Sequence, residues 1–124
     1  MKGIVFTPDD KMYVKEFDEP LYKSIGAEVG GYIEIVHPKG LPEPYMMVVN
    51  EEGLLQKLDF NTIGSFWYQT LIHGNPIVGN IVVAKEGFNE DGERDILGLN
   101  DEEIFAFKLM AISVSGGAIK EVNP

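Results

Sequence analysis

The chain has no cysteine, only two histidines and only ten lysine and arginine residues among its 124 positions. Without cysteine it cannot form disulfides, thiolate nucleophiles or cysteine-based zinc and iron–sulfur centres. No apolar run approaches the ~18 residues that a membrane-spanning helix needs. The run over residues 3–6 is also too short for a secretory signal. We therefore expect a cytoplasmic protein without a membrane partner.

Acidic residues dominate the charge. Twenty aspartates and glutamates against ten basic residues give a net charge of −10. Such a surface repels phosphate backbones, which argues against direct nucleic-acid binding. The hydrophobic fraction of 44% is that of a folded protein, and the length suits one domain over residues 1–124.

Hydrophobic periodicity and turn residues predict an α+β fold, a single small domain with a mainly antiparallel sheet and two or three short helices. In the first half the predicted ranges are 3–7 and 11–17 for a hairpin, 20–28 for a helix, 32–36 and 45–49 for strands, and 39–44 for a proline-rich loop. Asp18-Glu19-Pro20 supplies an N-cap candidate for the helix, and Gly30-Gly31 ends it.

In the second half, Asn50-Glu51-Glu52-Gly53 is predicted to be a turn in which Gly53 supplies a positive φ. A short partner strand is predicted at 54–55, one helix over 61–73 capped by Asn61 or Thr62, and a buried strand over 77–84. An acidic, solvated and mobile loop follows within 86–103. The last predicted elements are a helix capped by Asn100-Asp101-Glu102-Glu103 that continues to 110, and a strand over 111–115.

Side chains suited to catalysis are few and poorly spaced. His37 follows a predicted strand, and His73 ends a predicted helix, where favourable pairing with the helix dipole explains it. The alternating acids between Asn89 and Asp95 miss the EF-hand pattern, because its first and twelfth positions fall on Gly87 and Gly98. We expect a non-enzymatic protein with no catalytic residue, no metal and no cofactor.

Two features indicate binding instead. Successive helical residues are about 100° apart, so the three aromatics at 66–68 cannot all face one core, although Phe66, Trp67, Leu71 and Ile72 are each placed to reach it. A loop that follows a strand, such as 50–53, is also a common place for a site. Asn61 either donates to a ligand or, as we favour, stabilises this turn. The candidate binding residues are Asn50, Glu51, Glu52, Asn61, Trp67 and Tyr68.

Four stretches resemble a family of short uncharacterised proteins from phages, plasmids and chromosomes of Gram-positive bacteria, catalogued as domain of unknown function number thirty-eight forty-six. They are Gly30–Val36, Asn50–Leu54 with Asn61 following, Ile77–Val83 and Leu99–Ile104. The similarity covers residues 1–108 and leaves 109–124 as a variable tail. It implies a mobile-element setting and brings no catalytic residue.

Three functions follow as expectations. The first is a binding protein of phage or mobile-element type that sequesters or inhibits a host or defence protein. The second is a sponge-like protein for a small nucleotide ligand, with a pocket at the interface of a homodimer. There, Trp67 or Tyr32 stacks a base and Lys57, Lys85 or Arg94 meets phosphate. The third is an acidic nucleic-acid mimic that uses the carboxylates between Glu86 and Glu103.

Overall fold

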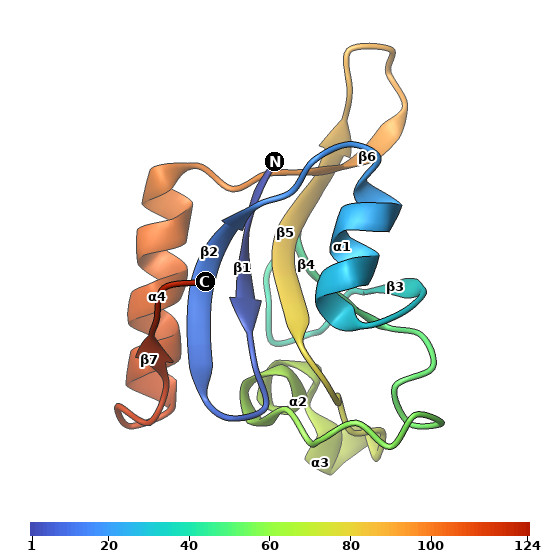
Figure 1. The fold of residues 1–124 in the computed structure, drawn as a ribbon. Helices are drawn as coiled ribbons and strands as arrows, with labels where there is room; N and C mark the ends of the chain where they lie inside the picture. Colours follow the sequence, from blue (N-terminus) through green and yellow to red (C-terminus); the bar gives the residue numbers. More distant parts are fainter.

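In the computed structural model, which describes residues 1–124, one seven-stranded sheet carries helices on both faces (Figure 1). The strands are β1 (Lys2–Phe6), β2 (Lys11–Glu16), β3 (Ile33–Val36), β4 (Tyr45–Asn50), β5 (Ile81–Phe88), β6 (Arg94–Leu97) and β7 (Lys120–Glu121). The helices are α1 (Leu21–Val29), α2 (Thr62–Tyr68), α3 (Thr70–His73) and α4 (Asp101–Val114).

The strand order is β3-β4-β5-β1-β2-β7, and β6 pairs with the second half of β5. Every pair is antiparallel except β2 with β7. The chain is therefore an α+β protein with a mainly antiparallel sheet, as the sequence predicts.

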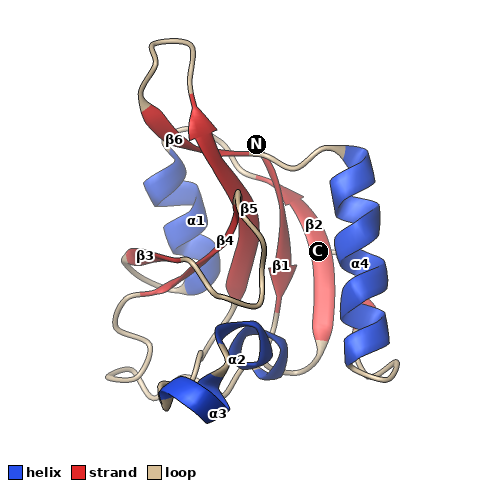
Figure 2. Cartoon of the chain, turned by 180° about the vertical axis from the view of Figure 1, so that it is seen from behind, coloured by secondary structure: helices blue, strands red, loops and turns tan.

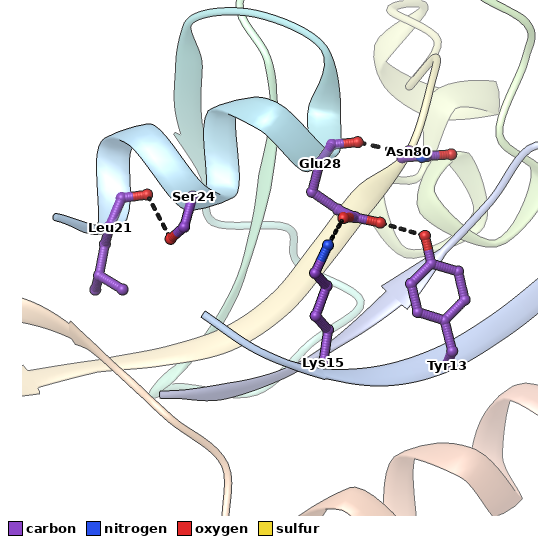
Figure 3. Close-up of polar contacts among 6 residues, drawn as sticks. All are labelled: Tyr13, Lys15, Leu21, Ser24, Glu28 and Asn80. Carbon is purple, nitrogen blue, oxygen red and sulfur yellow. Dashed lines mark hydrogen bonds and ion pairs between the residues drawn. The ribbon is translucent and has the colours of Figure 1, made fainter. Parts of the chain in front are cut away.

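One face of the sheet is covered by α1. Leu21, Ile25 and Val29 recur at helical spacing and pack on valines of the central strands. Glu28 fixes the end of the helix to β2, because its carboxylate accepts hydrogen bonds from Tyr13 Oη and, at 2.6 Å, from Lys15 Nζ (Figure 3). Burial and the Glu28 contact raise the pKa of Tyr13, so its hydroxyl stays protonated and remains a donor.

The other face carries α2 and α4, seen from behind in Figure 2. Trp67 is 1% exposed, and its ring meets the rings of Phe6 and Phe107 edge to face at centroid distances of 5.3 and 6.3 Å. Such aromatic pairs contribute about 0.5–1.5 kcal/mol beyond the area they bury. The Trp67 side chain therefore joins α2, the sheet and α4 in one core.

Several local predictions are confirmed. The hairpin, the helix near 20–28, the strands near 32–36 and 45–49, and the turn at 50–53 all form. Gly30 ends α1 with φ 89°. Asn61 caps α2, and Asn100 caps α4 in a reciprocal capping box with Glu103.

Other predictions are wrong. No side chain caps α1, because Pro20 occupies the cap position and Ser24 Oγ donates instead to the Asp18 carbonyl at 2.7 Å. Residues 54–55 lie in a turn and not in a strand. The helix predicted over 61–73 is split into α2 and α3 by Gln69, which adopts a left-handed φ of 63°.

The C-terminal half also differs from expectation. The strand predicted at 77–84 begins only at Ile81, and Val78 forms an isolated bridge with Phe60. The acidic loop predicted within 86–103 is largely the β5–β6 hairpin. Residues 111–114 continue α4 because Ala111 packs in the core one turn after Phe107.

The segment that the sequence leaves as a variable tail, 109–124, contributes Ala111 and Ile119 to the larger core cluster. No helix of the chain has both the length and the apolar character needed to cross a membrane.

Candidate interaction site

The turn after β4 is built around the side chain of Asn50. Its Nδ2 donates to the Val29 carbonyl at 3.1 Å and to Gln56 Oε1 at 3.0 Å, and its Oδ1 accepts from the Glu52 amide at 2.8 Å. Asn50 is buried and its polar atoms are occupied, whereas Glu51 and Glu52 are exposed. Asn50 therefore shapes the turn, and the two glutamates present charge to solvent.

Gly53 does not have the positive φ that the sequence predicts. The position needs glycine for another reason, because a Cβ there would lie 2.8 Å from Val78 Cγ2. The glycine thus lets the turn approach the segment that leads into β5.

A hollow of about 660 Å³, the turn hollow, brings four of the six predicted binding residues together. It is lined by 34–36, 49–55, Tyr68 and 75–78, which include Asn50, Glu51 and Glu52. Tyr68 is half-buried at its wall.

The structure places the other two predicted residues in the interior. Asn61 is 0% exposed; its Nδ2 donates to the carbonyls of Phe6 and Gly79 at 3.0 and 2.9 Å, and its Oδ1 accepts from the Gly64 amide at 2.9 Å. None of these partners belongs to the 50–53 turn. Asn61 holds α2 against the sheet, and Trp67 fills the core, so neither side chain lines the hollow.

Six large apolar side chains are exposed on α2, on α3 and on the segment 54–60, and these parts of the chain lie at the same end of the molecule (Figure 1). We call this the apolar end surface, and its residues are Leu54, Leu55, Phe60, Phe66, Leu71 and Ile72. The last four line a second hollow of about 490 Å³, and Leu54 and Leu55 line the turn hollow.

Sequence reasoning missed this surface because it assumed one continuous helix over 61–73. On that assumption Phe66, Leu71 and Ile72 face a core, but Phe66 is 59% and Leu71 104% exposed. The left-handed Gln69 redirects the chain, and both Leu71 and Ile72 are exposed. Gln has no special preference for that conformation, and no sequence signal marks the break.

A polar cleft of about 430 Å³ lies elsewhere and contains the best-placed histidine. His37 Nε2 is 2.9 Å from Glu86 Oε1, and Arg94 Nε is 3.7 Å from the other oxygen of the same carboxylate. No group of three or more histidine, aspartate and glutamate side chains is arranged to hold a metal ion.

Tyr45 at this cleft reaches a second cluster. Glu103 accepts from Tyr45 Oη at 2.6 Å and from Lys85 Nζ at 2.8 Å. The Glu103 contact raises the pKa of Tyr45. Burial raises the pKa of Glu103, but the bonds from the Asn100 amide, Lys85 and Tyr45 outweigh it and hold the pKa below its ordinary value. The cluster joins β4, β5 and α4.

Comparison with known proteins gives one match. A family described as a domain of unknown function (DUF3846) matches residues 1–111, most of the chain, and the chain belongs to this family. No curated protein and no solved structure matches it. The family description assigns no activity.

Proposed function

We propose that this member of the family is a non-enzymatic binding protein of phage or mobile-element type, which sequesters or inhibits a host or defence protein through its apolar end surface. The observation that carries the proposal is the exposure of six large apolar side chains at one end of a small domain. Contiguous exposed apolar patches are typical of protein-binding sites, whereas scattered single residues are not.

The position of these side chains supports the proposal. Leu55 is 80% exposed and Leu71 completely so, and no residue of α3 is buried. Packing within the domain therefore does not account for them. Burial against a partner stabilises a complex by roughly 1.5–3 kcal/mol for each fully covered large apolar side chain.

Charge indicates the character of the partner. Glu51 and Glu52 lie in the turn hollow beside Leu54 and Leu55, and the whole chain carries a net charge of −10. An apolar patch with acidic neighbours is complementary to an apolar patch with a basic rim. We therefore propose a partner with a basic surface.

The alternatives find less support. In the nucleotide reading Trp67 stacks a base, but its ring lies in the core, and Lys85 is paired with Glu103. In the mimic reading the carboxylates between Glu86 and Glu103 act as phosphates, yet both of these end residues take part in ion pairs within the chain.

Capture from a Gram-positive host lysate tests the proposal when it is coupled to matched variants. The double variant Phe66→Ser with Leu71→Ser removes two side chains of the apolar end surface. The control Phe105→Ser removes an equally exposed aromatic from α4. We expect one host protein to be retained by the wild type and by the control, and lost by the double variant.

Two results would contradict the proposal. One is that no protein is retained at micromolar concentration, or that all three proteins retain the same set. The other is turnover of a tested compound that a single change at His37 or His73 abolishes.

A further inference from the structure

The strand β3 forms an open edge of the sheet, since it pairs only with β4 (Figures 1 and 2). The Glu51 amide donates to the Tyr32 carbonyl at 2.8 Å, so this position is a hydrogen-bonded pair of the ladder. Bonded and non-bonded pairs alternate in antiparallel strands. Glu34 and Val36 therefore bond to β4, and the N–H and C=O groups of Ile33 and Ile35 point to the open edge.

This edge has little of the usual protection, because Glu34 is its only charged side chain. Exposed edges are commonly blunted by lysine, proline, a bulge or a covering loop. Between Ile33 and Val36 there is neither lysine nor proline, and the register with β4 runs without a bulge. No turn or loop hydrogen bond uses the backbone of Ile33 or Ile35. The opposite edge is β7, which has only two residues, one of them Lys120.

A hollow lies beside β3 on each face of the sheet. The turn hollow is on the α2 side, where Val36 packs against the larger core cluster. On the α1 side, a hollow of about 520 Å³, the tyrosine hollow, includes Tyr22, Tyr32 and Gln56. A strand added to β3 would point alternate side chains toward these two hollows.

The charge at this edge is negative. The residues that line the two hollows include Glu34, Glu51 and Glu52 but only one cation, Lys23. Tyr22 and Tyr32 are exposed, and tyrosine rings attract ammonium and guanidinium groups. Both features favour a ligand with lysine or arginine side chains.

We propose that β3 is a docking edge for an extended basic peptide segment of a partner protein, which adds a strand to the sheet. Its backbone bonds to Ile33 and Ile35, its basic side chains lie against the tyrosine hollow and Glu51 and Glu52, and its apolar side chains enter the turn hollow. This goes beyond the proposed function, because β3 lies outside the apolar end surface and the two sites share only Leu54 and Leu55, which line the turn hollow.

Charge also argues against a second copy of the chain as the occupant. Two copies paired through β3 would bring two chains of net charge −10 together, with Glu34 of each copy beside the same acidic edge of the other. A basic segment has the opposite, favourable interaction.

A displayed library of random peptides of about eight residues, within the usual range of strand lengths, tests the inference on the intact protein. We expect the selected peptides to be enriched in lysine and arginine. Ile35→Pro removes one outward N–H and keeps the bonds to β4, so it should weaken binding about tenfold. The double variant Glu51→Gln with Glu52→Gln should weaken binding and reduce its dependence on salt.

The control Glu90→Gln with Asp91→Asn removes the same charge from the β5–β6 hairpin and should leave binding unchanged. Two versions of the selected peptide can be N-methylated, one at its odd-numbered residues and one at its even-numbered residues. Methylation of the residues whose N–H groups face β3 should abolish binding, and methylation of the other set should spare it. This readout does not depend on whether Ile35→Pro folds.

Selection of peptides without basic enrichment, or equal binding by Ile35→Pro and the wild type, would overturn the inference. The inference would also be overturned if both methylated peptides bound equally well. A dimer of this chain that Ile35→Pro dissociates in a sedimentation experiment would overturn it too. Loss of host-protein capture by the apolar end variant is a separate result, because that variant leaves β3 intact.

Discussion

Replacing Asn61 by alanine should destabilise the fold. The change removes two hydrogen bonds to the carbonyls of Phe6 and Gly79 and the cap on the Gly64 amide, all buried. Each neutral bond contributes about 0.5–1.5 kcal/mol and a cap about 1 kcal/mol, so we expect a loss of about 3 kcal/mol. The melting temperature should then fall by roughly 10–15 °C.

Asn61→Asp sharpens this prediction. Aspartate keeps an oxygen for the cap but places a second oxygen opposite two carbonyls, where the amide nitrogen donated at 3.0 and 2.9 Å. At pH 7 the loss should exceed that of Asn61→Ala. It should shrink as the pH falls, because protonation restores a donor and the buried carboxyl has a raised folded-state pKa.

Urea unfolding followed by circular dichroism at pH 7 and pH 4 measures both effects. Thr62→Ala is the control, because Thr62 is the neighbouring cap candidate and its side chain is exposed. We expect a change below about 0.5 kcal/mol for it. A loss of less than about 1 kcal/mol for Asn61→Ala, or wild-type stability for Asn61→Asp at pH 7, would refute the structural role of Asn61.

Two further predictions concern contacts between elements. Glu103→Gln should lower the free energy of unfolding at pH 7. The pKa of Glu103 is depressed in the folded state, so the ionised side chain stabilises the fold above the ordinary carboxyl range. This stabilisation is lost as the pH falls through the folded-state pKa. Urea titrations of wild type and variant should therefore differ at pH 7 and converge only at a pH below the ordinary carboxyl range, and a pH-independent difference would contradict this. Gly40→Ala would place a Cβ 2.4 Å from the Trp67 carbonyl oxygen, which accepts the Gly40 amide at 2.9 Å, and should cost about 1–3 kcal/mol in the same assay. An unchanged urea midpoint would show that the contact does not constrain the chain.

The parts of the fold that the sequence predicts well depend on local chemistry. Asn61 and Asn100 cap helices through their own side chains, and Gly30 ends α1 because glycine adopts a positive φ without strain. Such signals act within four residues of one another, so the printed sequence contains them.

The errors arise where distant packing decides. The β-branched residues at 112 and 114 favour a strand, but α4 continues because Ala111 meets the core of the sheet. The candidate site shows the same limit. The sequence predicts the 50–53 turn and Tyr68 as separate binding candidates, and only the structure brings them to one hollow. It also predicts Trp67 as a candidate, since three adjacent aromatics do not reveal which ring the core takes.

The isolation of α3 from the core has a consequence for how this domain diversifies. A helix of four residues with none buried places almost no demand on folding, so its sequence can drift while the sheet behind it stays fixed. On the function proposed above, changes at positions 70–73 would therefore alter which partner is bound without unfolding the domain. Under that proposal, one short segment is enough to adjust recognition while the rest of the domain stays constant.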